Sequence, residues 1–130
     1  MAILDACSLA IVGVEGLSSF QARLTFAIGR HALVDLSQTL RLGPERADRL
    51  HLDPEAVSEL RAWLSRSGLR LGQGVEADRK LAELRALYMP YAQPLSQVLL
   101  MPLPPWLPPV RARYNWETTA WARTGGDEGH

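Results

Sequence analysis

The chain is 130 residues long, which is the size of one domain, and its 47% hydrophobic and 22% charged residues are typical of a globular protein. Its 14 basic and 14 acidic residues cancel, so the net charge favours neither nucleic acid nor an anionic membrane as a partner. The single cysteine, Cys7, excludes an intrachain disulfide. With neither a disulfide framework nor a signal-peptide pattern, we expect a cytoplasmic protein.

The first segment, Ala2 to Val14, is apolar except for Asp5 and Ser8. As a helix it would reach about 20 Å, which is short of the roughly 30 Å hydrocarbon core of a bilayer. It therefore predicts either a buried core helix or the end of a longer apolar segment. In both cases we expect no complete membrane span in this chain.

The second predicted helix spans residues 20–42, after a serine at position 18 or 19 that can cap it. Its apolar residues are Phe20, Leu24, Ala27, Ile28 and Val34 on one side and Phe26, Leu33, Leu36 and Leu40 on another. Only a narrow polar stripe remains between the two sides. A helix that is apolar on most of its circumference is usually buried, so we expect it to be central in the bundle. Gly43 and Pro44 should end it.

The third predicted helix begins at Asp53-Pro54, an N-cap carboxylate followed by a proline at the first helical position. Val57, Leu60 and Leu64 should form its buried stripe, and Gly68 should end it. Residues 69–74 alternate briefly, as a strand would, but their glycines favour a turn-rich link.

The fourth predicted helix has the most regular apolar spacing in the chain. Steps of three and four residues connect Leu81, Leu84, Tyr88, Tyr91, Leu95 and Val98. Because this period continues across Pro90 and Pro94, we expect one bent helix and not two. The seam predicts packing within the chain, and the alternative is a surface for self-association.

A proline-rich segment follows, from Met101 to Pro109, and should be extended polyproline II. One interpretation is that it folds back so that Trp106 covers the open end of the bundle; the other is that Pro102, Pro104, Pro105 and Trp106 bind a partner groove. Residues 1–109 thus form the predicted helical domain, and 110–130 a polar, disordered tail. Trp116 and Trp121 in that tail are weak candidates for membrane-interface anchors.

The sequence contains no recognisable catalytic or metal-binding pattern. Cys7 lies in an apolar stretch that should make its thiol inert, and the three histidines lack metal-ligand spacing. Arg30, His31 and Asp35 are the polar residues that stand out, since His31 and Asp35 are one helical turn apart and Arg30 could pair with Asp5 or Glu15. We interpret them as a structural polar network, and an enzyme using His31 and Asp35 is the least favoured reading.

Four stretches carry a resemblance to a known family: LDACSLAIVGVEG (residues 4–16), QARLTF (21–26), RHALVDL (30–36), and 81–106 with its LRALY, PY and LLMPLPPW motifs. They resemble the C-terminal, cytoplasmic helical region of bacterial two-transmembrane potassium channel proteins. In that family the region follows the pore module. The filter sequence T-V-G-Y-G is absent here, so the resemblance implies a chain that does not conduct ions alone.

We therefore expect an all-α fold, an irregular bundle of four to five helices with a proline-rich end. The predicted function is a non-catalytic cytoplasmic domain of a potassium channel family protein that serves subunit packing or regulation, without a cofactor. Expected partners are further copies of the chain or the channel pore module, at the cytoplasmic face of the membrane. The alternative is a freestanding module that homodimerises through the Leu81–Val98 seam.

Overall fold

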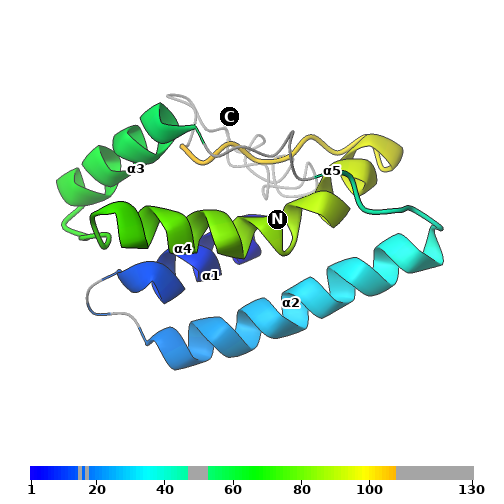
Figure 1. The fold of residues 1–130 in the computed structure, drawn as a ribbon, viewed down its shortest axis with the longest axis horizontal. Helices are drawn as coiled ribbons and strands as arrows, with labels where there is room; N and C mark the ends of the chain where they lie inside the picture. The colour runs from blue at the N-terminus through cyan, green and yellow to red at the C-terminus, as the bar shows by residue number, and fades with distance from the viewer. Residues whose placement is uncertain (15, 17, 47–52, 108–130) are drawn as a thin grey trace, which may run out of the picture.

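The computed structural model describes residues 1–14, 16, 18–46 and 53–107. Within these residues there are five α-helices and no strand, which confirms the all-α prediction. The helices are α1 (Ala2–Gly13), α2 (Ser19–Thr39), α3 (Pro54–Arg66), α4 (Val75–Ala86) and α5 (Met89–Val98). Figure 1 shows α2 as a long helix along one edge of the molecule, with α1 and α4 between it and α3. The predicted tail, including Trp116 and Trp121, lies outside the described residues.

Helix α1 is the central element of the fold. It packs against both α2 and α4, and its residues Leu4, Cys7 and Ile11 are buried. At Gly29 of α2, an added methyl group would lie 3.1 Å from the Leu4 side chain, so the missing side chain lets the two helices approach closely. The apolar composition of α1 therefore reflects a core position.

Two apolar clusters make up the core. The larger joins α1, α2 and α5 through Leu4, Cys7, Ile11, Phe26, Tyr88, Met89 and Ala92. The smaller joins the end of α1 to α3 and the 69–74 link through Val14, Leu60, Leu64 and Leu71. The link itself is a turn-rich connection, as predicted, with one isolated antiparallel bridge between Val14 and Leu71.

The prediction that α2 is the central helix is wrong. Only Phe26 and Ser37 of this helix are buried, and Phe20, Leu24 and Ile28 are exposed. The helix also ends at Thr39, before the predicted Leu42. Arg41 takes a left-handed conformation with φ of 57°, and the Leu42 amide donates to the Ser37 carbonyl at 2.8 Å, which closes the helix before Gly43 is reached.

Helix α3 has the predicted bounds. The Asp53 carboxylate accepts a hydrogen bond from the Glu55 amide at 3.0 Å, and Pro54 occupies the first turn. Val57, Leu60 and Leu64 are its buried residues. Gly68, with φ of 80°, follows the helix and allows the Leu69 amide to donate to the Leu64 carbonyl at 2.9 Å.

The prediction of one bent helix over Leu81–Val98 is also wrong, because the chain breaks at Leu87 and Tyr88 between α4 and α5. Pro90 lies at the start of α5, where its missing amide hydrogen is tolerated, whereas in one continuous helix it would leave the Ala86 carbonyl without its donor. Only Pro94 lies inside a helix. The apolar period continues across the break, so periodicity alone did not reveal it.

Half of the Leu81–Val98 seam faces the interior of the chain. Leu81, Tyr88 and Leu95 are buried, and Tyr88 belongs to the larger core cluster. Its residues therefore contact the chain's own helices. Leu84 and Tyr91 are half-buried and Val98 is 53% exposed, so self-association through the rest of the seam stays a prediction.

Candidate functional site

The three polar residues singled out in the sequence do not form one network. The His31 and Asp35 side chains lie 3.7 Å apart on the surface of α2, 80% and 61% exposed. The Arg30 Nε–H donates instead to the Leu87 carbonyl at 2.9 Å. Arg30 thus connects α2 to the α4–α5 break, while His31 and Asp35 form an exposed pair of little energetic weight.

The Arg30 contact has a simple physical origin. In a continuous helix, the Leu87 carbonyl would accept from the amide of Tyr91, but at the break that amide donates to Tyr88 at 3.1 Å. Arg30 satisfies the carbonyl that is left free. Pro94 has the same effect one turn later: it has no amide hydrogen, and the Pro90 carbonyl accepts from the Glu45 amide at 2.9 Å.

Tyr88, a predicted packing residue, joins α1 to the start of α5. Its hydroxyl donates to the Asp5 carboxylate at 2.6 Å, and its ring meets Phe26 edge to face with centroids 5.8 Å apart. Burial, together with the hydrogen bond to Asp5, raises the pKa of the Tyr88 hydroxyl above its usual range. Asp5 therefore contacts Tyr88 and not Arg30. Tyr91 is half-buried, and its carbonyl accepts a long 3.5 Å contact from Ser37.

The proline-rich segment folds back onto the helices. Trp106 packs against the smaller core cluster, and the Arg85 guanidinium lies 4.6 Å from the centre of its ring. Pro102 and Pro104, together with Leu95, line an apolar cavity of about 220 Å³ between this segment, α2 and α5. Pro102, Pro104 and Pro105 are all exposed. The segment thus folds back, as in the first interpretation, with Trp106 against the smaller core cluster. Binding of a partner groove by the exposed prolines stays a prediction.

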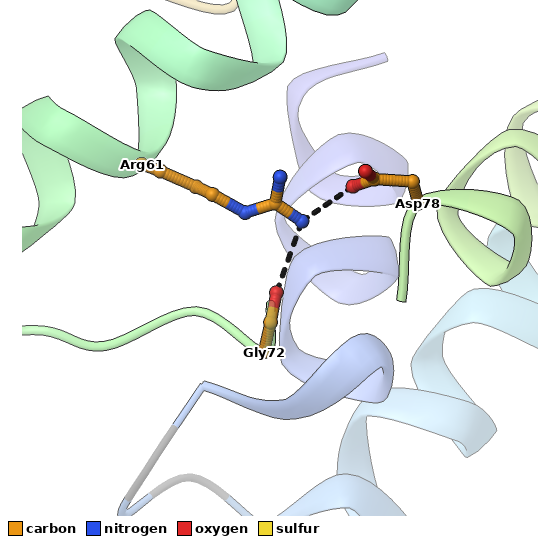
Figure 2. Close-up of polar contacts among 3 residues, drawn as sticks. All are labelled: Arg61, Gly72 and Asp78. Carbon is orange, nitrogen blue, oxygen red and sulfur yellow. Dashed lines mark hydrogen bonds and ion pairs between the residues drawn. The ribbon is translucent and has the colours of Figure 1, made fainter. Parts of the chain in front are cut away.

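A polar contact that the sequence did not reveal joins α3, the 69–74 link and α4. Figure 2 shows one terminal nitrogen of Arg61 facing both the Gly72 carbonyl and the Asp78 carboxylate. The distance to Gly72 is 3.0 Å. Asp78, the partner in another helix, 17 positions away, has no local sequence signal.

Two further features concern chemistry and membranes. Burial raises the pKa of the Cys7 thiol, which disfavours the reactive thiolate. No three His, Cys, Asp or Glu residues in the described part of the chain lie close enough together to hold a metal ion. Among the same residues, no helix combines the length and the apolar character needed to cross a membrane.

The most unusual surface feature is an apolar row on α2, here called the outer face and made of Phe20, Leu24, Ala27 and Ile28. Phe20 is 75% exposed, Leu24 48% and Ile28 63%. The spacing of four residues places them in line along the side of the helix away from Phe26. The sequence contained this row, but its period equals that of a core-facing stripe, so it was assigned to the interior.

Comparison with known proteins supplies no relative for this chain. No family model, no curated protein sequence and no solved structure matches it. Its function must therefore be argued from its own residues.

Proposed function

We propose that this chain is a non-catalytic helical packing domain that contacts further copies of itself through the outer face of α2. The observation that supports this most is the exposure of Phe20, Leu24 and Ile28 in one row on the longest helix. Contiguous exposed apolar residues are a mark of interaction surfaces. The Arg30 bond to the Leu87 carbonyl fixes this helix on the bundle and so presents the row rigidly.

A second copy is the partner because the row is self-complementary. In an antiparallel arrangement about a two-fold axis at Leu24, Phe20 of each copy lies opposite Ile28 of the other. The four-residue spacing on both sides of Leu24 makes this register symmetric. Arg23 is the only charged residue between Phe20 and Ile28, so the arrangement buries few charges.

The energy of this contact suits an assembly whose copies are also held together by another part of the protein. Burying a side chain of this kind completely is worth about 1.5–3 kcal/mol, which gives about 3–6 kcal/mol per copy for the exposed fractions of the three residues. Two copies contribute about twice that, against an association cost of about 4–15 kcal/mol. A free dimer should therefore be weak; a Kd of about 1 mM, which corresponds to a net gain of about 4 kcal/mol, lies within the range that these sums allow.

The larger assembly that we propose is a bacterial potassium channel of the two-transmembrane type. The resemblance of residues 4–16, 21–26, 30–36 and 81–106 to the cytoplasmic region of that family supports it. A pore module would hold several copies at high effective concentration, so that a weak contact between outer faces is sufficient. The domain would then lie at the cytoplasmic face of the membrane and take part in subunit packing, without catalysis.

Two experiments test the two levels of this proposal. For the channel assignment, the genomic sequence preceding the Met1 codon should encode, in frame, two hydrophobic spans around a T-x-G-Y-G-like filter. An untranslated region with its own ribosome-binding site would refute the assignment but leave the contact surface untouched.

For the contact surface, NMR spectra should be recorded from about 20 µM to about 2 mM, a range that brackets the expected Kd. Shifts that grow with concentration should be confined to the amides of Phe20 to Ile28. Ile28→Glu should abolish them, and Val75→Glu, a matched change at an exposed apolar residue of α4, should not. Spectra that are independent of concentration, or equal effects of the two variants, would refute the contact.

A further inference from the structure

A cavity of about 200 Å³ lies beside the Arg61 contact, between the end of α3 and the 69–74 link. It is lined by Arg61, Ser65, Leu69, Arg70, Leu71 and Gln73. Four of these six residues carry hydrogen-bonding side chains, two of them are cationic, and none is a carboxylate. Because one water molecule occupies about 30 Å³ of liquid, the cavity has room for a small polyatomic ion with some water.

Arg61 is fixed in place with part of its hydrogen-bonding capacity unused. One terminal nitrogen faces both the Gly72 carbonyl and the Asp78 carboxylate, while the other points away from these two contacts (Figure 2). Its Nε–H is buried and has no hydrogen-bond partner in the described part of the chain. A buried donor of a charged group that lacks an acceptor is costly, and native structures usually provide one.

The local charge favours an anion as the missing acceptor. Asp78 compensates the charge of Arg61, but it does not line the cavity. Arg70 adds a second positive charge, and none of the ion pairs among the described residues includes it. The Ser65 hydroxyl and the Gln73 amide can donate further hydrogen bonds. An oxyanion would accept from these groups, in the way that guanidinium groups bind carboxylate and phosphate.

We propose that this cavity binds a single oxyanion group, a phosphate or a carboxylate, through Arg61 and Arg70. The ligand would bridge α3 and the 69–74 link, which already meet through Arg61 and Gly72. The site is independent of the outer face of α2, so its function would be to couple the position of α3 to a small anionic molecule.

The test titrates inorganic phosphate, and in a parallel series acetate, into the labelled protein at constant ionic strength while the amides of Leu71 and Gln73 are followed by NMR. At least one anion should give saturable shifts below about 50 mM, with the Arg61 Nε–H resonance moving in parallel. Stronger binding of phosphate would indicate a phosphorylated ligand, and stronger binding of acetate a carboxylate.

Arg70→Gln should weaken binding at least fivefold, whereas Arg66→Gln, the same change at an exposed arginine of α3 outside the cavity, should alter it less than twofold. Arg70 is the better target because it holds no other element in place, so its variant should remain folded. The proposal is overturned if neither anion gives saturable shifts, or if the two variants weaken binding equally, which would indicate unspecific attraction.

Discussion

The hydroxyl of Tyr88 provides a direct test of how the first and last helices of the described chain are joined. Replacement of Tyr88 by phenylalanine keeps the ring and its edge-to-face contact with Phe26 but removes the 2.6 Å hydrogen bond to Asp5. A hydrogen bond to a charged group is worth about 1.5–3 kcal/mol. We expect Tyr88→Phe to lower the free energy of unfolding by that amount, since the half-buried Asp5 loses its donor.

Urea unfolding followed by circular dichroism gives the free energy of unfolding, and the expected loss corresponds to a decrease in Tm of about 4–8 °C per kcal/mol. Tyr91→Phe is the matched control, because it removes a hydroxyl from a half-buried tyrosine of α5, three positions after Tyr88. Tyr88→Ala, which also removes the buried ring, should cost about 3–5 kcal/mol.

The same hydrogen bond predicts that the free energy of unfolding depends on pH in the alkaline range. Burial and the Asp5 carboxylate raise the pKa of Tyr88 in the folded state above that in the unfolded chain, which is about 10. Its contribution to stability is therefore complete below about pH 10 and is lost as the pH rises toward the folded-state pKa. The difference in stability between the wild-type protein and Tyr88→Phe should shrink above about pH 10. A constant difference, or a Tyr88→Phe variant as stable as the Tyr91→Phe control, would refute the role given to the hydroxyl.

Three further changes have clear expected outcomes. Arg61→Met should destabilise the protein by about 2 kcal/mol. The loss should exceed that of Asp78→Asn, because Arg61→Met also leaves the Gly72 carbonyl without its donor. Urea unfolding of both variants shows which one is less stable. Gly68→Ala, at φ of 80° with open space around it, should cost about 1–2 kcal/mol, while Gly43→Ala, also in open space but without positive φ, should be neutral or slightly stabilising by the same assay. Cys7 should react with a thiol reagent only as fast as the protein unfolds, and rapid labelling of the native protein would contradict its burial.

The parts of the fold that the sequence predicts well depend on local chemistry. The bounds of α3 follow from Asp53, Pro54 and Gly68, since each acts on the backbone within a few residues of itself. The break between α4 and α5 was missed for a related reason. Pro90 is compatible with either a kink or the start of a new helix. The break is accompanied by burial of the Tyr88 ring and by the hydrogen bond from its hydroxyl to Asp5, which lies 83 positions away in the sequence.

The candidate sites were less predictable because they depend on long-range contacts. Arg30 was recognised as a structural residue, but its partner, the Leu87 carbonyl, becomes available only when the helix breaks. Arg61 was not singled out at all, because nothing near it in sequence marks its contacts with Gly72 and Asp78. Which of two apolar helices becomes buried likewise depends on the packing of the whole chain and not on the sequence of either helix alone. Helix α1, the shorter apolar helix, takes the centre, and α2 is left at the edge.

The position of α2 at the edge allows folding and contact to be separated experimentally. The triple variant Phe20→Glu, Leu24→Gln, Ile28→Lys changes three residues whose exposed parts contribute nothing to the core of the single chain, while Phe26 on the buried side is retained. Its free energy of unfolding should fall by no more than about 2–3 kcal/mol, because the covered parts of Phe20, Leu24 and Ile28 together amount to little more than one fully buried side chain. Its concentration-dependent NMR shifts should vanish, since both apolar area and symmetry are removed. A loss of more than about 5 kcal/mol would mean that the row belongs to the folded core of one chain, and the contact proposed for it would then be wrong.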